Sequence, residues 1–417
     1  MYIAHALFYF FLNQAQVHMA SPVASHSCAV KQYAAMKKIF YFIFIFLLPN
    51  SASFAKTQDS LIHILVQRIA SLQVSKDDFF LDGIFPSYIS NEEYFSTRKK
   101  DNNIFYNGLI TLTLKGIYNR LSKEDKIICD SIFARQKNLF AYFKNKSGRN
   151  TYNFWRTDSS FKFPYTGWVK LIKKHPSLPD DMDDTVLSLL ALNADDSVAE
   201  NTHLFMQDYV NNENNKVRTL LKQNQNIPAY STWFGKKFPT VFDACVISNI
   251  LYFVQYYNLK WSGADSASLQ YLVNVINDSS HIKNGIEVAP YYKETSIILY
   301  HYARLMSIKP IAALENLKLQ LLIDAIHQFS KSDELLEKVI LSNTILKLGY
   351  QPPALSLNVN LVNKIEQDNM CFFIGNVPSY MKDAQKVLLL SNKLGLFYHY
   401  CPAYNDALLL EYLVSAE

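Results

Sequence analysis

The segment PTVFDACVISNILYFVQYY (239–257) sets the pattern from which the fold is predicted. In it a proline is followed four residues later by an acid, then by a small residue and an almost wholly apolar run. The same order recurs in PYYKETSIILYHYARLM (290–306) and PAYNDALLLEYLV (402–414) and, with one extra residue, in PDDMDDTVLSLLAL (179–192). Two weaker members begin at FYNG (105–108) and EKV (337–339). The sequence therefore holds six similar helix starts.

Apolar runs of this kind predict buried helices, because a helix that is apolar on all faces must be surrounded on all sides. Between these runs, apolar residues recur at helical spacing with polar residues on the other face, which suits an outer layer of helices. We therefore predict an all-α fold, an (α/α)6 toroid of about six helical hairpins, for residues 56–417. The starts of the inner helices, with their acids, would then converge at one end of the toroid.

Helices between these runs are predicted from periodicity and from capping residues. Ser122 followed by Asp125 predicts one helix start, and Ser197 followed by Glu200 predicts a capping box. The segments with helical periodicity are 56–74, 122–143, 265–278, 314–329, 333–347 and 380–393.

The first 55 residues have the features of an export signal. Met36 and two lysines precede the apolar run IFYFIFIFLL (39–48), and PNSASFA (49–55) offers small residues for cleavage. The apolar run is too short to cross a bilayer, which needs about 20 residues. We expect an upstream segment at 1–35, a signal peptide at 36–55, and export of the remainder to the periplasm or the medium without a transmembrane anchor.

Removal of this leader changes the charge balance. Residues 1–55 contain three lysines and no arginine or acid, so the formal net charge falls from +5 to +2. Such a small charge predicts neither a nucleic acid nor an anionic membrane as a partner. The four cysteines that follow the leader lack the spacing of a zinc site, and their disulfide pairing stays open. They are Cys129, Cys245, Cys371 and Cys401.

The composition agrees with a helical fold and suggests an aromatic pocket. Only 11 of the 417 residues are glycine, which leaves few of the tight turns that dinucleotide-binding folds and β-sandwiches need. Phe and Tyr number 28 and 27, and the aromatic share of 14% exceeds what a helical core usually requires. An aromatic-lined pocket is therefore expected, with a Phe- and Tyr-rich core as the simpler alternative.

The string DDMDDT (180–185) is the most unusual in the chain, because four carboxylates crowd the start of a predicted helix. One acid near a helix N-terminus already stabilises the helix by about 0.3–1 kcal/mol, so four exceed what the helix dipole requires. Crowded carboxylates raise one another's pKa, and an acid that stays protonated near neutral pH can act as a general acid. The alternatives are a divalent cation bound at Asp180–Asp184 and a solvated acidic cap.

The segment DMDDT (181–185), followed by an apolar helix, resembles the DxDD-T motif of class II terpene cyclases. These cyclases belong, with the protein prenyltransferases, to a superfamily of α/α toroids. The resemblance implies that Asp183 protonates an alkene or an epoxide and that Asp181 and Asp184 keep it protonated and aimed. It also implies that aromatic side chains stabilise carbocations through their π faces.

Residues predicted to bind a substrate lie in this string or in loops expected at the same end of the toroid. No organic cofactor is predicted, and the expected ligand is a small molecule or a glycan. His399 is assigned no function, because no third group accompanies it and Cys401. The predicted binding residues are Asp180, Trp168, Tyr230, Trp233, Asp243, Tyr291, Tyr292, Glu294, Tyr404 and Asp406.

Two other functions stay open. The (α/α)6 barrel also carries glycoside hydrolases and polysaccharide lyases, in which two carboxyl groups stand about 5–9.5 Å apart. An acid of the string would then pair with Asp243 or Glu294. Trp168 and Trp233 would stack on sugar rings. Alternatively, a non-catalytic toroid would present a groove to a glycan or a protein, and the acids would be helix caps. The sequence leaves open whether the protein is an enzyme.

Overall fold

The structure is a computed structural model. It describes residues 58–91, 95–158, 178–219, 221–236, 238–355, 360–368, 370–391, 393 and 395–416. The predicted upstream segment and signal peptide lie outside the described residues. The chain divides into two units, Met1–Ser60 and Leu61–Glu417, and every element discussed below belongs to the second unit.

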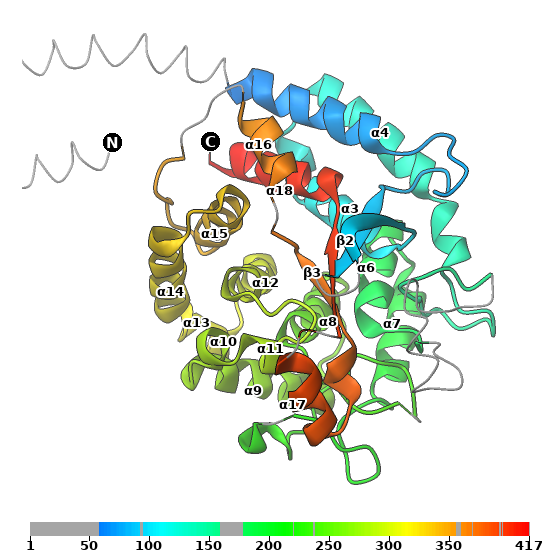
Figure 1. Cartoon of the computed structure of the whole chain (residues 1–417), viewed down its shortest axis with the longest axis vertical. Coiled ribbons are helices and arrows are strands. Elements are labelled where there is room, and N and C mark those ends of the chain that lie inside the picture. Colours follow the sequence, from blue (N-terminus) through cyan, green and yellow to red (C-terminus); the bar gives the residue numbers. More distant parts are fainter. Residues whose placement is uncertain are drawn as a thin grey trace, which may run out of the picture. The chain divides into compact units, whose positions relative to one another are not determined.

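Six apolar helices, called the inner helices from here on, make up the centre of this unit. Their bounds are α3 (Phe105–Ile117), α6 (Met182–Leu192), α8 (Ala244–Tyr256), α12 (Thr295–Ile308), α15 (Leu335–Lys347) and α18 (Pro402–Ser415). Each packs against two others, in the order α3, α6, α8, α12, α15, α18 and back to α3 (Figure 1). The contacts therefore form a closed circuit, and each inner helix contains one of the six predicted apolar runs, although α15 and α18 begin before the predicted starts.

The inner helices are buried on nearly all sides. In α3 only Lys115 and Gly116 are not buried, and in α8 only Tyr252 and Tyr256 are not. Burial of a Leu, Ile or Phe side chain stabilises a fold by about 1.5–3 kcal/mol, so enclosure of these apolar faces is a large part of the stability. Because these helices are enclosed on all sides, their sequences carry apolar residues on every face.

Amphipathic helices cover the inner helices from outside. In α9 (Gly263–Asn277), for example, the buried residues Ser268, Leu272 and Val275 recur at helical spacing on the side that packs against α8. The other helices of this layer are 58–72, of which 61–72 belong to this unit, α4 (Lys123–Gln136), α7 (Asp196–Met206), α14 (Lys318–Lys331) and α16 (Leu361–Gln367). Helix α17 (Asp383–Ser391) packs instead against the helical turn at Val377–Tyr380, with Val387 and Leu388 exposed. No helix among the described residues is both long enough and apolar enough to cross a membrane.

Single helical turns connect these elements. They are η1 (Tyr118–Arg120), η2 (Leu139–Tyr142), η3 (Lys222–Asn224), α10 (Ser280–Lys283), α11 (Gly285–Val288), α13 (Ala312–Glu315) and η4 (Val377–Tyr380).

One of the two predicted helix caps is confirmed. The Ser122 hydroxyl accepts a hydrogen bond from the backbone N–H of Asp125 at the start of α4. The capping box predicted at Ser197 and Glu200 is wrong, because the N-cap of α7 is Asp195, two residues before Ser197. Ser197 therefore lies inside the first turn, where its position cannot cap the helix.

A four-stranded antiparallel sheet corrects the all-α prediction. Its strands are β1 (Ser87–Asn91), β2 (Phe95–Asp101), β3 (Phe373–Asn376) and β4 (Leu396–Tyr400), in the order β2-β1-β4-β3. In β4, the sequence LFYHY is buried at four of its five positions, so it lacks the alternation of polar and apolar residues that identifies a strand. The fold is mainly helical, with this small sheet added.

The sheet lies against the N-terminal ends of inner helices. The Tyr106 hydroxyl, in the first turn of α3, donates to the carbonyl oxygen of His399 in β4 at 2.7 Å. The backbone N–H of Ile374 in β3 donates to the carbonyl oxygen of Tyr291, just before α12, at 2.8 Å. β3 and β4 therefore cover the end at which these helices begin.

The four cysteines of the described residues form no disulfide. Cys129, Cys245 and Cys401 are buried free thiols, and Cys371 is a partly buried one. Burial raises the pKa of Cys129 and of Cys401 to about 12. These thiols therefore stay protonated at neutral pH and are poor nucleophiles.

Helices α3 and α6 approach each other closely at Gly108. A Cβ atom at this position would lie 2.9 Å from the Cβ of Leu187 in α6. Gly116, about two turns further along α3, differs, because a Cβ atom there would have no neighbour within 4 Å. Only the first of these two glycines is required for packing.

The two glycines give a matched pair of substitutions. We expect Gly108→Ala to lower the free energy of unfolding by about 1–3 kcal/mol, because overpacking at the α3–α6 contact outweighs the better helix propensity of Ala. We expect Gly116→Ala to raise it by about 0.5–1 kcal/mol through propensity alone. Urea unfolding of both variants measures the difference, and equal effects of the two substitutions would contradict the close contact.

Candidate functional site

A small cavity lies where α3, α6 and α8 begin, with β3 and β4 forming part of its wall. Its volume is about 40 Å³, which holds about three water molecules at roughly 10–15 Å³ each. Its wall is mostly apolar and aromatic, and it includes three carboxyl groups, those of Asp181, Asp183 and Asp184, and the imidazole of His399. The structure therefore brings the three predicted catalytic acids to one cavity.

Asp181 is the N-cap of α6. Its Oδ1 accepts a hydrogen bond from the backbone N–H of Asp184 at 2.7 Å. Its carbonyl oxygen accepts from the hydroxyl of Thr185 at 2.6 Å. Burial raises the pKa of Asp181 to about 7. The first acid of the string therefore has a structural role at the helix start, whatever chemistry it supports.

Asp183 is held by hydrogen bonds on both of its oxygens. Its Oδ1 accepts from the Nδ2 of Asn249 in α8 at 2.6 Å, and its Oδ2 accepts from the hydroxyl of Tyr292. Burial raises the pKa of Asp183, and these two hydrogen bonds and the positive charge of Arg304 oppose the rise. The carboxyl group is therefore fixed in place by partners from α8 and from the loop before α12.

Asp184 is the unusual member of the string. It is 1% exposed, its carboxyl oxygens accept no hydrogen bond from an amide or a hydroxyl group, and its side chain lies against that of Asp181. Burial, followed by the negative charge of Asp181, raises the pKa of Asp184 well above its ordinary value. An unpaired carboxylate in such surroundings is costly, so the group retains its proton at neutral pH. The side chain is therefore a buried neutral acid in the cavity wall.

Asp180 points away from the other three acids. Its Oδ2 accepts hydrogen bonds from the Nδ2 of Asn145 and the hydroxyl of Thr151, the latter at 2.6 Å. It therefore lies outside the cavity wall, although it was predicted to bind a substrate. In the part of the chain that the structure describes, no group of three or more His, Cys, Asp or Glu side chains is placed to hold a metal ion.

Aromatic side chains from distant segments meet around the acids. Trp233 is 6% exposed, and its Nε1 donates to the Tyr291 hydroxyl at 3.1 Å. Phe154 and Phe373 stack with their ring centroids 5.2 Å apart. The surplus of Phe and Tyr in the composition is thus partly used in the wall of this cavity.

His399 lines the same cavity and lies beside Asp101, a pair that was missed from the sequence. The Nδ1 of His399 in β4 lies 3.2 Å from the Oδ2 of Asp101 in β2. The Oδ1 of Asp101 accepts from the Nε1 of Trp155 at 2.8 Å, which fixes the carboxyl group. The two residues come from opposite ends of the unit, so no local spacing in the sequence could have paired them.

Several predicted binding residues lie elsewhere. Asp243 caps α8 and also accepts from the backbone N–H of Tyr291 at 2.9 Å. Glu294 is half-exposed and forms an ion pair with Lys293. Asp406 faces Arg68, whose Nε lies 3.7 Å away. None of the three acids is in the cavity wall. Trp168 lies outside the described residues.

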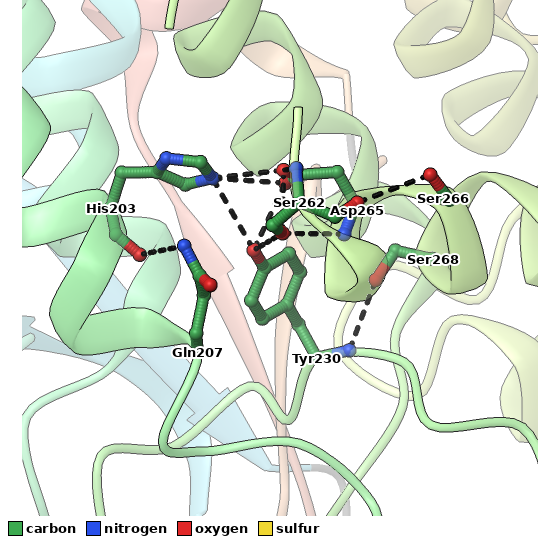
Figure 2. A network of polar contacts seen from close by, with 7 residues as sticks. All are labelled: His203, Gln207, Tyr230, Ser262, Asp265, Ser266 and Ser268. Atoms are coloured by element: carbon green, nitrogen blue, oxygen red, sulfur yellow. Dashed lines mark hydrogen bonds and ion pairs between the residues drawn. The ribbon is translucent and has the colours of Figure 1, made fainter. Parts of the chain in front are cut away.

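The two remaining predicted tyrosines are also buried away from the cavity wall. Tyr404 packs against the rings of Tyr106 and Phe372. Tyr230 joins a closed polar network between α7 and α9, in which its hydroxyl donates to Asp265 at 2.9 Å and lies near His203 (Figure 2). The predicted role of Tyr230 as a binding residue thus has no support in its position, because its hydroxyl is used within the fold.

The protonation state of Asp184 can be tested by substituting it and measuring how the free energy of unfolding depends on pH. An acid whose pKa is raised by folding lowers the free energy of unfolding as pH rises above its ordinary pKa, by up to about 1.4 kcal/mol per pH unit. We therefore expect the stability of the wild-type protein to fall from about pH 4 towards neutrality. The fall should be shallower in Asp184→Asn, because one of the raised acids is gone.

Urea unfolding at several pH values between 4 and 7 measures this slope. Asp196→Asn is the matched control, because Asp196 is an exposed acid in the first turn of α7. Equal slopes in wild type and Asp184→Asn would show that Asp184 is ionised in the fold, contrary to the expectation.

The cavity thus combines a buried neutral acid, a histidine beside an aspartate and an aromatic wall. Groups of this kind can move a proton to and from an apolar molecule. Comparison of the chain with models of protein families, with curated proteins and with solved structures finds no match.

Proposed function

We propose that the protein is an exported (α/α)6 toroid that acts as a class II terpene cyclase-like enzyme and protonates an unsaturated apolar substrate. The observation that carries the proposal is the Asp184 carboxyl group, which is buried in the wall of an aromatic cavity beside that of Asp181 and accepts no hydrogen bond from an amide or a hydroxyl group. Asp406 is also buried without such donors, but it lies beside Arg68 and outside the cavity, so Asp184 is the neutral acid that a substrate there would meet. A protonated acid of this kind is the group that alkene protonation requires.

The architecture is consistent with this proposal. Six inner helices in a closed circuit of contacts, covered by outer helices, are the arrangement expected of an (α/α)6 toroid. The export part of the proposal rests on the leader, with its basic start, apolar run and small residues before Lys56.

Asp184 fits the role of proton donor better than Asp183. The motif assigns the donor to Asp183, but both oxygens of Asp183 already accept hydrogen bonds from Asn249 and Tyr292. Asp184 accepts from no amide or hydroxyl group and lies against the Asp181 carboxyl group, so in this proposal its proton moves from that pair to a substrate. In this scheme Asp183 and Asp181 are positioning residues, whose negative charges help to raise the pKa of Asp184.

The proposed reaction is an isomerisation in which atoms and charge balance. The Asp184 carboxyl group gives its proton to one carbon of a double bond, and the π electrons form the new C–H bond. The resulting carbocation is stabilised by aromatic faces such as Trp233 and Phe154, and a second double bond attacks it to close a ring. His399, beside Asp101, takes up the proton released at the end.

Substrate entry requires a movement of the wall. A cavity of about 40 Å³ is far smaller than the roughly 300–1,000 Å³ of pockets that hold small molecules. The inner helices give only Phe105, Asp183, Asp184 and Val246 to the wall, and loops and strands supply the rest. Among these, the strand β3, with Phe373 and Gly375, is the segment that we propose to move.

Glycan cleavage has less support. It needs a second catalytic carboxyl group and an open groove. Asp243 caps a helix, and Glu294 is paired with Lys293 at the surface. Trp233 is buried and cannot stack on a sugar in this arrangement. A purely binding function would leave the buried neutral acid at Asp184 without an explanation.

The reaction predicts a labelled isomer. Purified protein in D2O, given a panel of linear prenyl alcohols and prenyl epoxides, should yield a product that is one mass unit heavier than the substrate in gas chromatography–mass spectrometry. The added deuterium comes from Asp184 after exchange with solvent. We expect Asp184→Asn to slow this reaction by about 10²–10⁴-fold, the usual contribution of a general acid.

Asp196→Asn, the exposed control in α7, should react like the wild type, and melting curves of both variants separate lost chemistry from lost folding. No deuterated isomer from any substrate of the panel, or full activity of Asp184→Asn, would rule out the proposal. Release of reducing ends from a parallel polysaccharide panel would favour glycan cleavage instead.

A further inference from the structure

A second and larger cavity lies at the opposite end of the inner helices. Its volume is about 440 Å³. Its wall comes from the C-terminal halves of α3, α8, α12, α15 and α18, through residues such as Gly116, Tyr252, Arg304, Lys347 and Glu411. Gly116 is exposed at its rim, so the cavity is open to solvent.

Arg304 is a buried cation in the wall of this cavity. It is 5% exposed, and its Nη2 donates to the Oδ1 of Asn249. Its Nη1 is buried without a hydrogen-bond partner. The carboxylate nearest to it in this network, Asp183, is reached only through the Asn249 amide. Because a guanidinium group does not lose its proton, its burial with a free N–H is costly and calls for a partner.

Glu411 does not provide that partner, although it lines the same cavity. The Nζ of Lys347 lies 2.7 Å from its Oε1, and the hydroxyl of Tyr300 donates to its Oε2 at 2.8 Å. The negative charge of Glu411 is therefore balanced by Lys347. Arg304 therefore has no direct ion pair at the cavity wall, and its link to the Asp183 carboxyl group runs through the Asn249 amide.

The chemistry of the wall defines the ligand that would fit. An Arg guanidinium group pairs its parallel N–H groups with the two oxygens of a carboxylate. Around it, Leu112, Ile308 and Leu346 offer apolar surface, and the Tyr300 ring centroid lies 5.3 Å from the Arg304 Cζ. A volume of about 440 Å³ is within the usual range for a small organic molecule.

We infer that this cavity is a binding site for a small organic carboxylate, whose anionic group pairs with Arg304 and whose apolar part lies against Leu112 and Ile308. The Nη1 of Arg304, which is shielded from solvent and lacks an acceptor, gains one when the side chain turns towards such a ligand. The site is separate from the acid cavity and does not rest on the function proposed for that cavity.

Isothermal titration calorimetry with the wild-type protein tests this inference. The probes are phenylacetate, its uncharged counterpart phenylacetamide, and inorganic phosphate. We expect phenylacetate to bind at least tenfold more tightly than phenylacetamide, because only the carboxylate pairs with Arg304. We also expect it to bind more tightly than phosphate, which lacks an apolar part. Absence of phenylacetate binding, equal binding of the amide, or equal binding of phosphate would overturn the inference.

Three variants locate the binding. Gly116→Phe places a ring at the cavity rim and should abolish phenylacetate binding, whereas Gly116→Ala leaves the cavity open and should bind like the wild type. Arg304→Lys keeps the charge without the paired N–H groups and should bind phenylacetate at least tenfold more weakly. Melting curves confirm that each variant folds. Unchanged binding by Gly116→Phe would overturn the site even if Arg304→Lys failed to fold.

Discussion

The inner helices are apolar on every face, and the rest of the structure depends on the requirement that they be enclosed. Because each of them contacts two others in a closed circuit, their first turns are buried together with the polar residues that cap them. Buried acids at this end must either find hydrogen-bond donors or keep a proton. Asp243 finds three backbone N–H groups, Asp183 finds Asn249 and Tyr292, and Asp184 finds none. The acid cavity is therefore a direct product of how the helices are enclosed.

Local sequence signals were enough to place the inner helices, because an apolar run and its capping residues specify a helix by themselves. These signals gave the wrong helix start where two nearby residues both suit the beginning of a helix. In α18 the helix begins at Pro402, since proline suits the first helical position, and Asp406 lies a full turn inside the helix. Asp406 was predicted at the helix start and therefore in the pocket, and its actual place beside Arg68 follows from this shift.

Features that depend on pairing between distant segments could not be predicted in this way. The sheet joins β1 and β2 to β4 and β3 from the other end of the unit, so that His399 lies in the cavity wall with Asp101 beside it. Asp181, Asp183, Asp184, Trp233 and Tyr291 were predicted and do line the cavity, because they lie at or beside inner-helix starts. Tyr230 also precedes an inner helix, α8, in the sequence. Its hydroxyl group donates to Asp265 in α9, a residue too distant in the sequence for local spacing to reveal this contact.

The Asn249 amide connects the two ends of the helical centre. Its nitrogen donates to Asp183 and its oxygen accepts from Arg304, so the direction of the amide dipole is fixed by one anion and one cation. A buried dipole held in this way transmits electric potential without any shift of the backbone. The Asn249 side chain therefore connects Arg304, in the wall of the larger cavity, with Asp183, in the wall of the acid cavity, through two hydrogen bonds inside the apolar centre.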